Sequence, residues 1–208
     1  MKNVIVLSHP LVRRDLSLLR DRQTPSHIFR SVLRRTASLM AYEVTRDLPT
    51  TTMRIATPLE KTDGVRVAKP VVLVPILRAG LGMVGGFIEV LPDARVGHIG
   101  LYRNEETLRP VDYYFKVPRS IGGALVIILD PMLATGGSAV AAVSYLKKRG
   151  ARTIRFVSLV AAPEGVAALR KAHPDVPIYT CSLDRGLNDR GYILPGLGDA
   201  GDRMFGTE

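Results

Sequence analysis

The sequence predicts an α/β protein with a central parallel sheet flanked by helices. Two uninterrupted apolar runs, at 71–77 and 125–129, are rich in β-branched residues, which is typical of strands buried on both faces of a sheet. Strand-like and helix-like segments alternate from the first run onward, a pattern that favours a parallel sheet with helices on both faces. The expected strands cover 71–77, 95–102, 125–129, 153–161 and 176–182, and the expected helices cover 81–91, 137–149 and 163–172.

The N-terminal segment does not share this alternation. A short apolar run at 3–7 predicts a strand. Thr24 followed by Pro25 is typical of a helix N-cap and first turn, and the apolar spacing beyond them predicts an amphipathic helix as far as Asp47. Residues 51–58 predict a strand outside the central sheet.

The alternation also fails between Leu101 and Pro118. This segment is charged and aromatic, and Asn104-Glu-Glu-Thr107 is turn-like. We expect an extended hairpin arm that leaves the body and either covers a ligand or contacts another subunit. After Leu183 the chain is rich in glycine and has little periodicity, which indicates a long loop of functional importance or a disordered tail.

These segments together predict one domain, because 208 residues fit a single core and no low-complexity linker divides them. The expected parts of the single domain 1–208 are a core at about 68–182, a small hood formed by 1–67 and 183–208, and a hairpin arm at about 101–118.

The net charge is strongly positive: 29 Lys and Arg against 19 Asp and Glu give +10. This balance indicates an anionic partner, but it does not distinguish nucleic acid from a phosphorylated metabolite. The basic residues are dispersed along the chain, so most are expected to lie on solvated helix faces.

Cysteine and histidine usage excludes other classes. A single cysteine, Cys181, cannot form an internal disulfide and suits a reducing cytoplasm. The four histidines have no ligand-like spacing, so no metal is expected to be held directly by the protein. No apolar run approaches the length of a bilayer span and the first residues lack a signal-peptide layout. We therefore expect a cytoplasmic protein with no membrane partner.

The first candidate site is the segment 130–138, which links a buried strand to a helix. Thr135, Ser138 and the glycines between them place hydroxyls and amides at a helix N-terminus, where an anion is favoured. Asp130 follows the strand directly, at the edge where ligands of open α/β sheets bind. An acid beside an anion-binding turn suggests a sugar phosphate; the alternative is an ordinary turn with Thr135 as the N-cap.

The second candidate segment follows the strand at 71–77. Gly80, Gly82 and Gly85 spell G-x-G-x-x-G, which leaves a nicotinamide-dependent oxidoreductase as an alternative function. The next strand does not end in an acid for a ribose hydroxyl, so we expect these glycines to serve packing. Arg78 is the expected charge partner for a second phosphate group.

The third candidate segment runs from Gly191 to Arg203. Its apolar residues Ile193, Leu194 and Leu197 are costly to leave in water, which argues against a disordered tail. A loop rich in glycine and proline exposes backbone N–H and C=O groups, and these can pair with the edge of a flat heterocycle.

Five motifs in these and neighbouring segments resemble those of the uracil phosphoribosyltransferases, a family of type I phosphoribosyltransferases. The similarity follows the same order over nearly the whole chain. Two positions differ: Pro131 stands where the wider type I family usually has a second acid, and Gly85 stands where uracil enzymes commonly have one. The motifs are PILRAGLG at 75–82, YRNEET at 102–107, DPMLATGGS at 130–138, AAPEG at 161–165 and GYILPGLGDAGD at 191–202.

This resemblance implies the type I phosphoribosyltransferase fold and a reaction of pyrimidine salvage. The 5-phosphoribosyl group of 5-phosphoribosyl 1-diphosphate (PRPP) passes to N1 of uracil, giving UMP and diphosphate, with Mg²⁺ bound through PRPP. The implied catalytic residues are Arg78, Arg103, Asp130 and Asp199. The implied PRPP-binding residues are Arg78, Arg103, Asp130, Pro131, Met132, Leu133, Ala134, Thr135, Gly136, Gly137, Ser138 and Asp199, and those for uracil are Ile193, Gly198, Asp199 and Ala200.

The resemblance assigns each group a role. The turn at 135–138 holds the 5-phosphate, Asp130 accepts hydrogen bonds from the ribose hydroxyls, and Arg78 and Arg103 neutralise the diphosphate. Asp199 contacts the sugar diphosphate or its hydrated metal. It further implies a homo-oligomer, a dimer or tetramer, and a GTP effector as in some relatives. The alternative function on the same fold is an RNA-binding regulator of pyrimidine operons. The sequence argues against it, because the basic residues are not interleaved with aromatic residues on which bases could stack.

Overall fold

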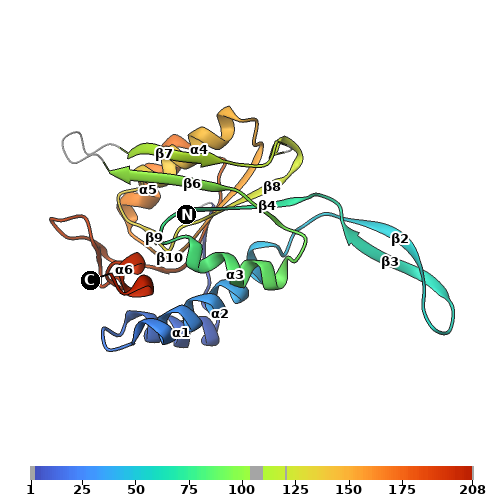
Figure 1. The fold of residues 1–208 in the computed structure, drawn as a ribbon, viewed down its shortest axis with the longest axis horizontal. Coiled ribbons are helices and arrows are strands. Elements are labelled where there is room, and N and C mark those ends of the chain that lie inside the picture. Colours follow the sequence, from blue (N-terminus) through green and yellow to red (C-terminus); the bar gives the residue numbers. More distant parts are fainter. Residues whose placement is uncertain (1–2, 104–109, 120, 208) are drawn as a thin grey trace.

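The computed structural model describes residues 3–103, 110–119 and 121–207. In this part of the chain a nine-stranded sheet has the main order β1-β11-β10-β8-β4-β6-β7, with β5 beside β4 and β9 beside β10 (Figure 1). Its strands are β1 (Val4–Val6), β4 (Val71–Leu77), β5 (Arg95–Val96), β6 (His98–Arg103), β7 (Pro110–Lys116), β8 (Leu125–Leu129), β9 (Met132–Leu133), β10 (Thr153–Ala161) and β11 (Ile178–Leu183).

All neighbouring strands of this sheet run parallel except β6 and β7. The central register pairs Val71 of β4 with Leu125 of β8, and Leu125 with Thr153 of β10. The predicted parallel α/β fold is therefore confirmed. Because the strands are parallel, the loops that follow β4, β8, β10 and β11 leave from the same edge of the sheet.

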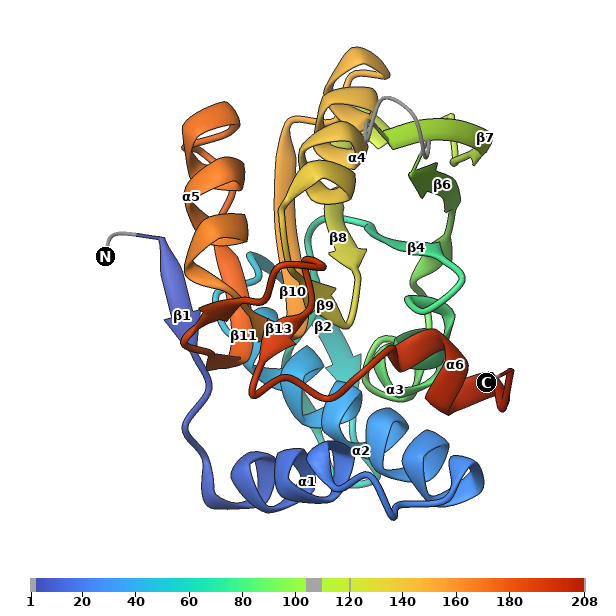
Figure 2. The same cartoon turned by 90° about the vertical axis from the view of Figure 1, so that its left-hand side faces the viewer.

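Helices cover both faces of the sheet (Figure 2). Successive side chains of a strand point to opposite faces, so Leu73 and Ile127 pack with buried residues of α1, α2 and α3, while Val74 and Ile128 pack with those of α4 and α5. The helices are α1 (Pro10–Arg20), α2 (Ser26–Val44), α3 (Leu81–Val90), α4 (Gly137–Lys148), α5 (Pro163–Ala172) and α6 (Ala200–Phe205).

The N-terminal helices differ from the expectation. The N-cap of α2 is Pro25 and not Thr24, because the Thr24 hydroxyl instead donates to the Leu18 carbonyl at 2.7 Å. The helix ends at Val44, three residues before the expected end. Helix α1, which the sequence reading did not predict, buries Leu16 and Leu19 under α2.

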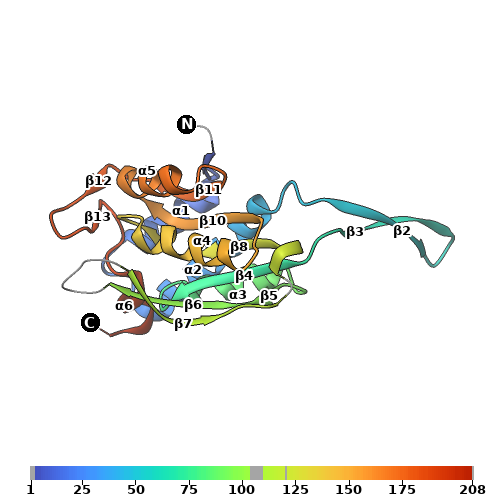
Figure 3. The same ribbon diagram turned by 90° about the horizontal axis from the view of Figure 1, so that it is seen from above.

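The protruding arm lies elsewhere in the chain than predicted. It is the antiparallel hairpin of β2 (Thr50–Ala56) and β3 (Lys61–Val67), which extends away from the body (Figures 1 and 3). The hairpin predicted at 101–118 is present as the antiparallel strands β6 and β7, but it lies at the edge of the central sheet and does not leave the body. The reason is that β6 pairs with β4 and buries Ile99 and Leu101 in the core. Among the described residues, no helix is long and apolar enough to cross a membrane.

Candidate functional site

Three loops meet at the carboxyl edge of the sheet, after β4, β8 and β11. The loop after β4 lies against the end of β8: a Cβ placed on Gly80 would come within 2.3 Å of the Leu129 carbonyl oxygen. The guanidinium of Arg78 in the same loop reaches Asp202 of α6, with 3.1 Å between Nη2 and Oδ1. The structure therefore brings together the three segments that the sequence singled out.

The loop after β8 leads directly into α4. Gly136 is the N-cap of this helix, with φ of 84°, and contributes no side-chain cap. A Cβ on Gly136 would lie 2.9 Å from both the Gly165 carbonyl oxygen and the Ala168 Cβ, so a side chain here would be strained and crowded. Because Gly136 has no side chain to cap the helix, it leaves the first backbone N–H groups of α4 available to donate hydrogen bonds to an anion. Thr135 is exposed and is not the N-cap.

Asp130 is the most perturbed acid at this edge. Its side chain is partly buried, and burial raises the pKa of Asp130 to about 7, with a further upward contribution from the charge of Asp199. The Met132 amide donates to Oδ1 at 3.4 Å and offsets part of this rise. A carboxyl group with this pKa is poised to accept hydrogen bonds from hydroxyls or to lie beside a cation.

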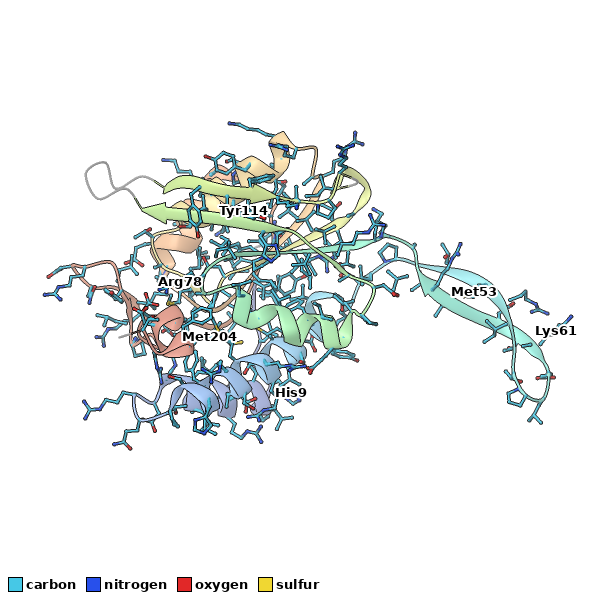
Figure 4. All side chains as sticks on the ribbon, in the orientation of Figure 1. His9, Met53, Lys61, Arg78, Tyr114 and Met204 are labelled. Atoms are coloured by element: carbon cyan, nitrogen blue, oxygen red, sulfur yellow. The ribbon has the colours of Figure 1, made fainter. Side chains whose placement is uncertain are left out.

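Arg78 is the first residue after β4 and is exposed. The peptide bond that precedes it is cis. Its guanidinium pairs with Asp202 and lies 5.9 Å from the centre of the Phe205 ring, so α6 holds it (Figure 4 labels Arg78). Since the Arg78 side chain is 58% exposed, it is accessible to a ligand at the sheet edge.

The glycines of the G-x-G-x-x-G pattern pack helix α3. A Cβ on Gly82 would lie 2.2 Å from the Met204 sulfur and 2.5 Å from a Leu33 methyl carbon. A Cβ on Gly85 would lie 3.4 Å from Nε of Arg34. Gly82 therefore lets α2 and α6 approach α3 closely, as expected for a packing glycine, whereas the Cβ position of Gly85 is at ordinary contact distance and does not require glycine.

The loop after β11 forms a cavity of about 240 Å³. The short strands β12 (Gly186–Leu187) and β13 (Ile193–Leu194) pair within this loop, and Ile193 lines the cavity. The cavity is lined by Met132, Ala134, Val160, Arg190, Gly191, Tyr192, Ile193, Leu197, Gly198 and Asp199. Because Met132 and Ala134 also belong to the loop after β8, the cavity adjoins the turn at 135–138.

The predicted uracil-binding residues occupy defined places around this cavity. Ile193, Gly198 and Asp199 line it, while Ala200 is buried at the start of α6. Asp199 is the N-cap of α6 and accepts from the Asp202 amide at 3.0 Å. The apolar content of the segment was a sound signal of order, since Ile193 and Leu197 are buried.

Some predicted residues cannot be placed in full. Arg103 ends β6, but its side chain and the motif at 104–107 lie outside the described residues. Among the residues that the structure describes, no group of three or more His, Cys, Asp or Glu side chains could hold a metal ion. Buried Cys181 has its pKa raised to about 12 by burial, as befits an unreactive thiol.

Sequence reasoning missed Asp202 and several residues that line the cavity, among them Val160 and Arg190. Asp202 pairs with Arg78. It follows Asp199 by three residues, a spacing typical of a helix N-cap and its first turn, and this spacing was the available signal for a helix there. Val160 lines the cavity near the carboxyl end of β10. Its position near the end of a predicted strand was the available signal that it lies at the edge of the sheet where ligands bind.

Comparison with known proteins agrees with this geometry. The family model described as uracil phosphoribosyltransferase matches residues 6–207. A protein of Caulobacter vibrioides named uracil phosphoribosyltransferase is 57% identical over 208 residues, which is 100% of both chains.

Solved structures give the same result at the level of the fold. A protein from Aquifex aeolicus superposes with a TM-score of 0.93 at 37% identity, over 97% of both chains. A purine phosphoribosyltransferase from Pyrococcus horikoshii, at 18% identity and a TM-score of 0.50 over 87% of this chain and 88% of that one, shares the fold alone. A match across nearly all residues, with the predicted motifs gathered at one sheet edge, means that the chain belongs to the uracil phosphoribosyltransferase family.

Proposed function

We propose that the protein transfers the 5-phosphoribosyl group of PRPP to N1 of uracil, producing UMP and diphosphate. The observation that carries this proposal is the shared wall between two parts of the site. Met132 and Ala134 belong to the loop that precedes α4 and also line the cavity formed by the loop after β11. A phosphorylated sugar and a flat base would therefore meet at this wall.

The 5-phosphate is assigned to the turn at 135–138. Gly136 leaves the first turn of α4 without a capping side chain, and the helix dipole favours negative charge at that end. The hydroxyls of Thr135 and Ser138 are further donors. This part of the site is specific for phosphate but carries no information about the base.

The ribose is assigned to Asp130. Burial and the charge of Asp199 destabilise its carboxylate in the free protein, so hydroxyl donors from a bound ribose would stabilise the ionised form. Asp130 thereby orients the sugar ring toward the cavity that holds the base.

The diphosphate is assigned to Arg78 and Arg103. A planar guanidinium forms paired hydrogen bonds with phosphate oxygens and stays charged at all relevant pH values. Arg78 is held near the site by Asp202 in the structure. On binding, we expect its guanidinium to exchange this carboxylate for the leaving group.

Uracil is assigned to the cavity between Ile193 and Ala200. Backbone N–H and C=O groups there would pair with the N3 and carbonyl edge of the base. Cytosine presents a reversed pattern at C4 and N3, and buried backbone groups would then lack partners, which costs affinity.

Magnesium is proposed to accompany PRPP. The carboxylates of Asp130 and Asp199 suit a hard cation, but they number fewer than the ligands of an all-protein cage, so a hydrated ion held by the diphosphate fits the site. When bound, Mg²⁺ would neutralise charge on the leaving group. Asp199 is the residue assigned to its water shell.

Catalysis is proposed to depend on positioning and charge. The described residues that line the cavity include no histidine, lysine or cysteine, and Asp199, which does line it, is assigned to the hydrated metal, so no side chain is assigned to remove the N1 proton. Holding the base and the sugar in the reactive orientation lowers the activation barrier, because their loss of translational and rotational entropy occurs on binding. The arginines stabilise the negative charge that develops on the departing diphosphate.

A homo-oligomer is proposed from the arm. Both strands of the β2–β3 hairpin are exposed or half-buried along their whole length, and Leu59 and Val65 are 95% and 71% exposed. An isolated hairpin with apolar side chains in water is only marginally stable, so a second subunit is the expected cover. Activation by GTP stays a prediction that rests on the family resemblance, and a cytoplasmic location stays a prediction that rests on cysteine usage.

The test of the proposed function is diphosphate release from PRPP with uracil as the acceptor. We expect release that requires uracil and Mg²⁺, with cytosine and the purine bases as inactive controls. Release at the same rate with a purine base, or none with uracil, would overturn the assignment.

A further inference from the structure

We propose that the ion pair between Arg20 and Asp184 is a positioning pair that fixes the loop facing the base and so sets affinity for uracil. This inference rests on the proposed function, because it concerns the same cavity. Neither residue lines that cavity, and both act through the backbone of the loop at 195–198.

Asp184 is a buried acid that directly follows β11. Its side chain is 2% exposed, and burial alone would raise its pKa. Hydrogen bonds from Arg20, the Ser182 hydroxyl and the Gly196 amide outweigh burial and lower the pKa of Asp184. The carboxylate is therefore ionised and fully hydrogen-bonded where β11 passes into the loop.

Arg20, the last residue of α1, makes three contacts in this cluster. Nη2 lies 2.5 Å from Oδ1 of Asp184 and Nη1 lies 2.8 Å from Oδ2. Nη1 also donates to the Gly196 carbonyl at 2.6 Å. One guanidinium thus ties the hood helix, the end of the sheet and the loop together.

Gly196 has both backbone groups committed to this pair. Its amide donates to Oδ2 of Asp184 at 2.9 Å, while its carbonyl accepts from Arg20. Its φ of 61° and a Cβ position only 2.1 Å from the Ile193 carbonyl oxygen require glycine at this turn. The loop cannot shift at residue 196 without breaking the contacts to both charged groups.

The neighbouring residue is held in the same manner by a second arginine. Arg203 of α6 donates to the Leu197 carbonyl at 2.9 Å and to the carbonyls of Leu19 and Asp21 at the end of α1. Its guanidinium also lies 4.6 Å from the centre of the Phe29 ring. The loop is thus held against the end of α1 at two successive residues.

This arrangement explains how a loop with few side chains can present a rigid hydrogen-bonding edge. Ile193 and Gly198 flank the fixed residues 196 and 197 and line the cavity. Hydrogen bonds that read a base depend steeply on distance and angle, so a displacement of about 1 Å at this edge would weaken uracil binding strongly. In the described part of the chain, the hydrogen bonds of the Arg20 and Asp184 side chains go to each other, Ser182 and Gly196 and not to the loop at 130–138, so that loop would keep its geometry.

The test is steady-state kinetics of Arg20→Lys, with both substrates varied. Lysine keeps the charge but cannot bridge both carboxylate oxygens and a carbonyl as a planar guanidinium does. We expect the KM for uracil to rise about tenfold or more, the KM for PRPP to stay within about twofold, and the preference for uracil over cytosine to fall. Arg20→Ala should have the larger effect of the two.

Arg155→Lys is the matched control. Arg155 likewise binds a carboxylate and a backbone carbonyl, those of Asp47 and Val44, but it lies near the amino end of β10. Its variant should lose stability without a change in the KM for uracil. If Arg20→Lys does not fold, Ser182→Ala removes only the hydroxyl that donates to Asp184 at 2.6 Å, and we expect the same selective rise at smaller size.

The possible outcomes distinguish failure of the proposed function from failure of the positioning role of Arg20 and Asp184. Wild-type protein without uracil-dependent diphosphate release would overturn the proposed function. A wild-type protein that uses uracil, together with an Arg20→Lys variant of unchanged KM for uracil or an equal rise in the KM values of both substrates, would overturn the positioning role alone.

Discussion

The guanidinium of Arg78 lies 3.1 Å from the carboxylate of Asp202, so the loop after β4 is joined to the last helix across 124 residues of sequence. The pair is half-exposed, with 58% of the Arg78 side chain and 32% of the Asp202 side chain accessible. Exposed pairs of this kind contribute little to stability, typically about 0–1 kcal/mol. The contact therefore serves to place Arg78 at the site more than to hold the fold.

Arg78→Ala is expected to reduce kcat/KM for PRPP about 100-fold or more, because charge on the departing diphosphate loses a guanidinium. The far-ultraviolet circular dichroism spectrum and the melting temperature should stay close to those of the wild type. Asp202→Asn is the control, since it loosens Arg78 without removing it. Unchanged diphosphate release by Arg78→Ala would refute the role.

Asp130→Asn is expected to weaken use of PRPP about tenfold or more while changing uracil binding far less. The amide that replaces the carboxylate accepts hydrogen bonds from hydroxyls less strongly. The measurement is kcat/KM for each substrate with the other saturating. Equal losses for the two substrates would contradict the assignment of Asp130 to the ribose.

At alkaline pH, Asp130→Asn should be more stable to unfolding than the wild type. Burial raises the pKa of Asp130 from 3.8 to about 7, so between these values the folded state binds more protons than the unfolded state. The free energy of unfolding then falls as pH rises through this window, by at most about 4 kcal/mol. Urea denaturation at pH 4.5 and pH 8 should show Asp130→Asn more stable than wild type only at the higher pH; equal curves at both would contradict the shift.

Gly136→Ala is expected to impair both stability and PRPP binding. Gly136 has φ of 84° and a crowded Cβ position, whereas Gly150 has φ of 92° and no neighbour within 4 Å of its Cβ position. Both alanine variants incur the cost of a left-handed backbone, about 1 kcal/mol. Gly136→Ala alone adds the clash with Gly165 and should raise the KM for PRPP. Equal denaturation midpoints for the two variants would show that crowding has no effect.

The central sheet could be predicted from sequence because its strands are short apolar runs, a pattern typical of buried parallel strands. The run at 125–129 is apolar at every position and coincides with β8. The arm was misplaced because the residues at 51–58 predict a strand outside the central sheet but do not show that it pairs with a second strand to form a projecting hairpin. The segment 101–118, though charged, shares its first residues with β6, where Leu101 is buried.

The site was predictable where residues follow strands and not where distant segments meet. Asp130 and Arg78 lie directly after buried strands, and the topology alone places them at one edge. The contact of Arg20 with Asp184 joins residues 164 apart, and no local spacing indicates it. Helix α1, which carries Arg20, was itself missed, since charged residues separate its buried positions Val12, Leu16 and Leu19.

The raised pKa of Asp130 also gives the free site a variable charge near neutrality. With a pKa of about 7, this carboxyl is present in both its protonated and its ionised form near pH 7. A ligand that favours the ionised carboxylate would release that proton into solution. The heat of PRPP binding in calorimetry should therefore vary with the ionisation enthalpy of the buffer, and Asp130→Asn should reduce that variation.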